Sequence, residues 1–179
     1  AIGHLRQIVR AEGEKRGIIE ASKHFIENGG CKFYCAPGIN GESWKNPDIS
    51  PEKSSELLFK YNHFIDEELV PLIYEDCGGP VPVITCGMGE GAFYSANTYF
   101  RRPDMLLGCI SIDGDYDIRH LTGGYFDENC YYNSPVDYLP NLNDPYWMSF
   151  LVNRHHVFIY AGSGDGSNPD HAYRLGNIL

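Results

Sequence analysis

The sequence is poor in basic residues. Its 179 residues include 14 Lys and Arg against 24 Asp and Glu, which gives a formal net charge of −10. Nucleic acids and anionic membrane surfaces are bound by clustered Lys and Arg, whereas the longest basic runs here are the doublets Lys15-Arg16 and Arg101-Arg102. The chain also lacks an apolar run near the roughly 18–20 residues of a membrane helix. We therefore expect neither nucleic acid nor a membrane as a partner.

The sequence also lacks a recognisable metal-binding pattern. Cys31 and Cys35 form a C-x3-C pair, but no second pair stands at zinc-site spacing. Cys35, Cys86 and Cys109 lie in apolar stretches, where buried free thiols are expected. We expect no metal and no cofactor. Free thiols, together with an opening that does not resemble a signal peptide, predict a cytoplasmic protein.

Apolar periodicity predicts helices and strands in alternation. The Ser50-Pro51-Glu52 stretch is a strong helix start, with a hydroxyl N-cap and Pro at the first helical position. We expect helices over 15–28, after Ser50, over 91–100 and over 170–179. The helix after Ser50 is expected to place its apolar residues on one face, namely Leu57, Leu58, Tyr61, Phe64, Ile65 and Leu69. We expect strands over 32–36, 80–85, 107–112 and 157–160.

This alternation predicts an α/β fold, with a mostly parallel sheet and helices on both of its faces. No linker divides the chain, so we expect one domain over residues 1–179. Ligands bind such sheets beyond the carboxyl ends of the strands. The loops of interest are therefore 37–48, 85–91, 113–143 and 161–169, of which 113–143 is expected to be a lid or another long functional loop.

The glycine-rich turn that follows the strand at 80–85 allows two interpretations. Gly87-x-Gly89-x-x-Ala92 fits a dinucleotide-binding fingerprint, and Asp113 ends the next strand where a ribose-binding acid would stand. The same turn fits the nucleophile elbow of a hydrolase, which reads G-x-S-x-G between a strand and a helix. Placing Thr85-Cys86-Gly87-Met88-Gly89 on that pattern puts Gly87 at the apex, where the serine should be.

Several longer stretches carry a family resemblance. They are "YCAPGINGESW" (34–44), "TCGMGEG" (85–91), "RRPDML" (101–106), "IDGDYD" (112–117) and "GGYFDENCYYNSPVDYLPNL" (123–142). On these stretches the chain resembles the putative esterase family of α/β-hydrolases, which includes esterase D-like and feruloyl-esterase-like proteins. The match over 123–142 is the longest and the most specific of them.

The resemblance implies a three-layer α/β-hydrolase fold, truncated here at both ends, and a triad of Ser, acid and His in chain order. Gly87 then replaces the nucleophile, and Asp165 is the candidate acid. The histidine segment and part of the oxyanion loop are expected to lie outside this chain, because His171 follows Asp165 too closely. Glu90 brings a negative charge where an oxyanion needs N–H donors.

The leading hypothesis is a catalytically inactive homologue of these esterases that retains ligand or protein binding. A small ester or a carbohydrate-like molecule would bind in a cleft formed by Ser43, Trp44, Met88, Tyr125 and Tyr131, although the tyrosines of 113–143 are also explained by packing of the lid. One alternative is an active carboxylic-ester hydrolase that uses another nucleophile or a water molecule near Asp165. A second alternative is dinucleotide binding, and homo-oligomer formation is left open.

Overall fold

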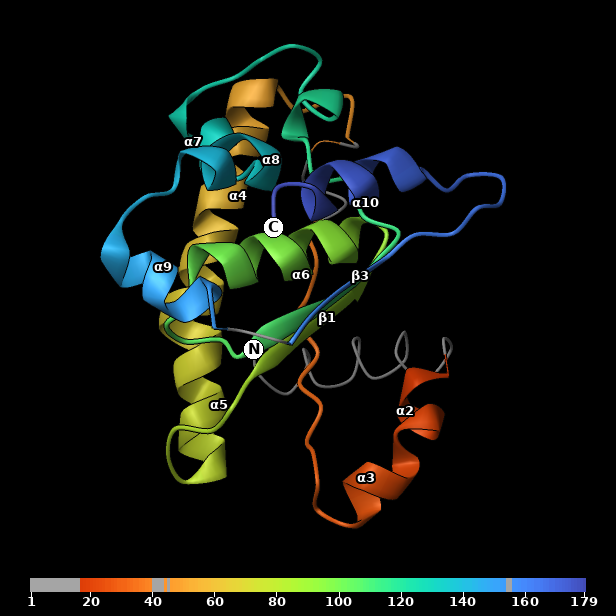
Figure 1. Ribbon diagram of the computed structural model, residues 1–179, viewed down its shortest axis with the longest axis vertical. Coiled ribbons are helices and arrows are strands. Elements are labelled where there is room, and N and C mark those ends of the chain that lie inside the picture. Colours follow the sequence, from red (N-terminus) through yellow and green to blue (C-terminus); the bar gives the residue numbers. More distant parts are fainter. Residues whose placement is uncertain (1–16, 40–43, 45, 154–155) are drawn as a thin grey trace. The chain divides into compact units, whose positions relative to one another are not determined.

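The computed structural model of the chain describes residues 17–39, 44, 46–153 and 156–179 (Figure 1). Its internal contacts divide the chain into two compact units, one up to Gly38 and the other from Ile39 to Leu179. Each unit is described by itself below. The expectation of one domain over the whole chain stays a prediction.

The first unit contains two short helices, α2 (Ile18–Ala21) and α3 (Lys23–Glu27), within the range where one helix was expected. Gly29, at φ 69°, follows α3 and turns the chain out of the helix. Residues 31–39 have no regular secondary structure. The predicted strand at 32–36 is therefore wrong, because none of the described strands pairs with it and an apolar stretch becomes a strand only with a neighbour.

A long helical rod opens the second unit. It consists of α4 (Pro51–His63), the π-helical segment η2 (Phe64–Leu69) and α5 (Val70–Cys77). The predicted start is confirmed, since the Ser50 hydroxyl accepts a hydrogen bond from the Lys53 N–H at 3.3 Å. Gly78, in the left-handed region at φ 78°, ends the rod.

The π-helical segment shifts the face that the rod buries. Leu58, Tyr61 and Ile65 are buried at spacings of three and four, and the next buried apolar residue is Val70, five positions after Ile65. This gap matches the wider i→i+5 turn of a π-helix. Leu69, which the α-helical period placed on the buried face, is only half-buried, so that part of the prediction is wrong.

The second unit contains a three-stranded parallel sheet. Its strands are β1 (Ile84–Met88), β2 (Gly108–Ile112) and β3 (Val157–Tyr160), in the order β1-β2-β3. In the register, Gly87 stands opposite Ser111, and Ser111 stands opposite Ile159. The predicted α/β class is thus confirmed as a mixture of helices with a small parallel sheet.

The helix α6 (Glu90–Arg101) covers one face of this sheet (Figure 1). Every residue from Ala92 to Phe100 is buried. The Thr85 hydroxyl donates to the Ser95 carbonyl at 2.9 Å, and the Ser111 hydroxyl donates to the Ala92 carbonyl at 2.8 Å. Small and hydroxylated strand residues therefore let the helix approach the sheet closely.

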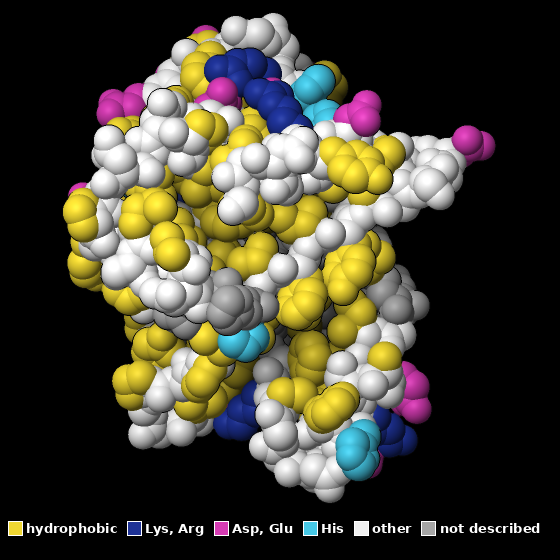
Figure 2. All heavy atoms as spheres, viewed as in Figure 1, with side chains coloured by type: hydrophobic (Ala, Val, Ile, Leu, Met, Phe, Trp, Pro, Cys, Tyr) yellow, Lys and Arg dark blue, Asp and Glu magenta, His cyan; other side chains and the backbone are white. Residues whose placement is uncertain are grey.

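The opposite face of the sheet carries exposed apolar side chains. Figure 2 shows hydrophobic side chains reaching the surface over the strands, and Ile84, Met88, Phe158 and Tyr160 are each more than 40% exposed. Cys86 lies on this face and is exposed, whereas Cys109 is buried. The prediction of a buried thiol is confirmed for Cys109 and wrong for Cys86, because alternate strand residues face opposite sides.

The chain between β2 and β3 contains only short helices. They are η3 (Ile118–His120), α7 (Glu128–Tyr131), α8 (Pro135–Tyr138), η4 (Leu139–Asn141) and α9 (Pro145–Leu151). The last helix, α10 (Pro169–Gly176), lies within the predicted helical range 170–179 except for its first residue. None of the helices in the described ranges is both long and apolar enough to cross a membrane.

Candidate functional site

Gly87 lies inside β1, paired with Ser111, and not at the apex of the strand-to-helix turn. A Cβ atom on Gly87 would stand 1.9 Å from the carbonyl oxygen of Gly91 in the first turn of α6. Glycine is required at this position because the helix backbone presses against the strand. The placement of Gly87 at the apex is therefore wrong.

The apex of the turn is Gly89, which connects β1 to α6. Its backbone has φ 58° and ψ −121°, a conformation that residues with a side chain rarely adopt. The Gly89 N–H donates to the Ile112 carbonyl at 2.9 Å. A Cβ atom on Gly89 would meet no atom within 4 Å, so a side chain at this position would project into open space.

With the apex known, the pattern G-x-S-x-G falls two residues later than expected. Gly87-Met88-Gly89-Glu90-Gly91 has both outer glycines of the pattern, and Gly89 takes the place of the serine. The two flanking glycines were visible in the sequence and could have given this placement. What stays unchanged is that the central position has no side chain that could attack a substrate.

Glu90 places a carboxylate in the first turn of α6. Its Oε1 accepts a hydrogen bond from the Tyr94 hydroxyl at 2.8 Å. Burial, with a smaller contribution from the Glu90 charge, raises the pKa of Tyr61 to about 12. An acid here competes with any anion that would use the helix N-terminus, whether a pyrophosphate or an oxyanion.

Asp113 ends β2 and binds the loop that follows β3. Its Oδ1 accepts from the Gly162 N–H at 3.1 Å, and its Oδ2 accepts from the Ser167 hydroxyl at 2.7 Å. Both carboxylate oxygens are thus engaged by the protein itself, which leaves less acceptor capacity for a ribose. Asp165, the candidate acid, is exposed in the same loop, and none of the residues in the described ranges forms a hydrogen bond or ion pair with it.

The structure does not gather the other predicted cleft residues around the turn. Ser43 lies outside the described residues. Trp44 is half-buried, and its indole N–H has no hydrogen-bond acceptor among the described residues. Met88 is 42% exposed on the sheet face opposite α6. The Tyr125 hydroxyl donates to Asp127 at 3.0 Å, and the Tyr131 hydroxyl accepts from Asn141 at 3.1 Å.

Buried polar contacts fix the segment 113–143 to the helices beneath it. The Asn133 side-chain oxygen accepts from the Asn62 amide at 2.8 Å and from the Asn97 amide at 2.7 Å, which joins the segment to α4 and α6. Asp127 caps α7 through the Cys130 N–H at 2.8 Å and accepts from the Ser55 hydroxyl of α4 at 2.7 and 2.9 Å. The predicted lid is therefore a packed layer of this unit.

A pocket of ≈ 170 Å³ lies where α10 meets this layer, and sequence reasoning missed it. Asp117, Val136, Asp170, His171 and Arg174 line it. It brings together side chains from three segments, which no local pattern reveals. One signal was available, namely that His171 and Arg174 stand one helical turn apart while two acids follow the strand end at 115 and 117.

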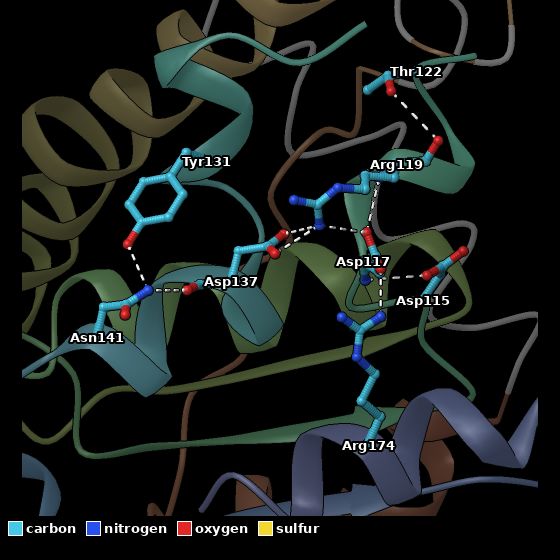
Figure 3. Close-up of polar contacts among 8 residues, drawn as sticks. All are labelled: Asp115, Asp117, Arg119, Thr122, Tyr131, Asp137, Asn141 and Arg174. Carbon is cyan, nitrogen blue, oxygen red and sulfur yellow. Dashed lines mark hydrogen bonds and ion pairs between the residues drawn. The ribbon is translucent and has the colours of Figure 1, made fainter. Parts of the chain in front are cut away.

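Asp117 forms hydrogen bonds with two arginines at this pocket. It accepts hydrogen bonds from the Arg174 guanidinium at 2.5 Å and from the Arg119 N–H at 3.0 Å, and Figure 3 shows it between the two arginines. Burial alone would raise the pKa of Asp117, but these hydrogen bonds and the guanidinium charges outweigh it and hold the pKa below its usual value. His171 forms an ion pair through Nδ1 with Asp115.

The described residues contain no group of three or more His, Cys, Asp or Glu side chains placed to hold a metal ion. The exposed Cys86 is a weak candidate nucleophile, because partial desolvation of its sulfur raises the thiol pKa. Comparison of the chain with family models, with curated proteins and with solved structures gives no match.

Proposed function

We propose that this chain is a relative of the putative esterases with an α/β-hydrolase fold, in which the nucleophile elbow persists without its nucleophile. In this proposal the protein does not perform serine-based acyl transfer and instead binds a small ester-like or carbohydrate-like ligand beside Gly89. The observation that carries the proposal is the backbone of Gly89, at φ 58° and ψ −121° between β1 and α6.

The arrangement around Gly89 supports this proposal. A positive-φ residue between a parallel strand and a buried helix is the geometry by which an elbow exposes its central residue. Gly87 permits the close approach of α6 to β1, because a Cβ atom there would stand 1.9 Å from the carbonyl oxygen of Gly91.

The two alternative functions have less support. Glu90 disfavours a pyrophosphate at the start of α6, and Asp113 is already bound to Gly162 and Ser167. An active hydrolase that uses Cys86 would need a thiolate, which the raised pKa opposes. A water molecule activated by Asp165 would lack the oriented partner that a general base requires.

A fluorophosphonate probe, which modifies activated serine and related nucleophiles, tests the proposal directly. We expect the intact mass of the wild-type protein to stay unchanged after incubation with the probe. Loss of the nucleophile in a serine hydrolase removes about 10⁶ of the turnover. A stoichiometric adduct on the wild-type protein would overturn the proposal, because it would reveal a working nucleophile.

Two glycine substitutions test where the elbow lies. The Gly89→Ser variant should fold, at a cost of about 1–3 kcal/mol for its positive φ. The matched Gly87→Ser variant should fail to fold, because its Cβ would meet the Gly91 backbone at 1.9 Å. A Gly89→Ser variant that fails to fold, or a Gly87→Ser variant as stable as the wild type, would contradict the proposed position.

A further inference from the structure

The helix α10 is attached to the rest of its unit mainly by charged contacts. Leu175 is its one fully buried side chain, and Tyr173 is 71% exposed. Two cationic residues of α10 instead reach the segment after β2, where Arg174 meets Asp117 and His171 meets Asp115. A helix that buries so little apolar surface depends on such contacts for its position.

The two contacts respond differently to pH. Arginine keeps its charge at every physiological pH, so the pair of Arg174 with Asp117 is permanent above the range in which carboxylates titrate. Histidine changes its charge between about pH 5 and 8. The pair of His171 with Asp115 is therefore a full ion pair only when the imidazole is protonated, and a neutral imidazole leaves a weaker hydrogen bond.

Charged groups from two segments surround His171. The segment after β2 contributes Asp115 and Asp117, and α10 itself contributes Asp170 and Arg174. Arg174 is already neutralised by Asp117, so the surplus charge that faces the imidazole is negative. The contribution from α8 is Val136, which is uncharged.

Two further charged groups lie next to this cluster. The Arg119 guanidinium is paired with Asp137 at 2.5 Å and with Asp117 at 3.5 Å, so it brings no free positive charge. The His120 ring of η3 lies 4.7 Å from the His171 ring, centroid to centroid.

We propose that His171 is a pH-sensitive latch that holds α10 against the segment Asp115–Arg119 when it is protonated and loosens the helix when it is neutral. The side chain is 12% exposed, and its partner Asp115 is 33% exposed, so protons reach the pair without unfolding of the unit. Because α10 supplies three of the five residues that line the pocket, the pocket opens as the latch releases. This inference does not depend on the proposed function at Gly89.

Hydrogen exchange of the full chain, followed by mass spectrometry, measures the latch. The rates are corrected for the intrinsic pH dependence of exchange, and peptides from α10 are compared with peptides from the buried helix α6. We expect protection of α10 to fall about fivefold between pH 5.5 and 7.5, the size of a partly exposed ion pair, while α6 stays constant. Constant protection of α10 over this range would overturn the proposal.

Variants at the latch distinguish it from a general effect of pH. His171→Gln should give weak protection of α10 at both pH values, and His171→Lys should give strong protection at both. His63, the last residue of α4, forms a similar but exposed pair with Glu67 of η2 at 2.9 Å, so His63→Gln should leave the response of α10 unchanged. A response that persists in His171→Gln, or that disappears in His63→Gln, would overturn the role of His171.

Discussion

The segment 113–143 and the loop 161–168 both follow strands of the same parallel sheet, yet they are held in very different ways. The first contributes Tyr116, Ile118, Asn133 and Tyr138 to the buried interior, and its side chains bond to α4 and α6. The second is exposed over most of its length, and the side chain that holds it belongs to Asp113.

This difference assigns separate roles to the two loops. A segment whose polar groups are buried and bonded cannot move without leaving those groups unpaired, which is costly. A loop that is bound by two exposed hydrogen bonds opens at little cost. The segment 113–143 is therefore a structural layer of this unit, whereas 161–168 is a segment that can open.

The largest loss of stability is expected from Asn133→Ala, which removes a buried contact of the segment 113–143. The substitution leaves the Asn62 and Asn97 amides buried without their shared acceptor, and each unpaired group costs about 1–3 kcal/mol. We expect the free energy of unfolding in urea to fall by about 3 kcal/mol. Asn141→Ala is the control, since that amide is exposed, and it should cost less than about 0.5 kcal/mol. Equal losses in both variants would contradict the buried network.

A smaller effect is expected from Ser55→Ala, which removes the hydroxyl that α4 donates to Asp127. Asp127 keeps its bonds to the Cys130 N–H and the Tyr125 hydroxyl, so no charge is left unpaired. We expect a loss of about 1–2 kcal/mol in chemical unfolding. An unchanged stability would mean that water replaces the hydroxyl and that the segment is less firmly bound than we infer.

Acid should loosen the segment 113–143 before the sheet. Burial opposes ionisation of Asp117 and Asp127, but hydrogen bonds and, for Asp117, arginine charges lower both pKa values. Their stabilisation is present above the unfolded value of about 3.9 and is lost as pH falls through the lower folded values. Unfolding measured from pH 6 to 2 should show this loss, and Asp117→Asn combined with Asp127→Asn should reduce its slope. A double variant with the wild-type slope would contradict this assignment.

The smallest change in stability is expected from Asp113→Asn, which weakens the attachment of the loop 161–168. The free energy of unfolding should change by less than about 1 kcal/mol, because both hydrogen bonds are exposed. Limited proteolysis should nevertheless cut the loop faster in the variant than in the wild type. Equal cleavage rates would show that Asp113 does not control the loop.

Local signals in the sequence predicted several elements correctly. The Ser50-Pro51 helix start and the strand Val157–Tyr160 were found because caps and apolar runs act over a few residues. The glycine turn was misplaced by two residues, because two overlapping patterns differ only in where the strand ends. The exposure of Cys86 depends on which face α6 covers, and a single strand does not reveal this.

The pocket beside α10 could not be predicted for a different reason. Its residues come from the segment after β2, from α8 and from α10, and they meet only after β3 has joined the sheet. The pairing of His171 with Asp115 joins positions 56 residues apart in the chain. Such contacts are a consequence of topology, so a local pattern carries little information about them.

The π-helical segment between α4 and α5 also determines which side chains of α5 face the interior. Each α-helical residue turns the chain by about 100°, so one extra residue in Phe64–Leu69 reorients the whole of α5. Deletion of the exposed Glu67 would restore a regular helix and would turn Val70 and Ile73 away from the interior. Removal of one residue from this segment would therefore require compensating substitutions along α5, because the side chains that face the interior would change.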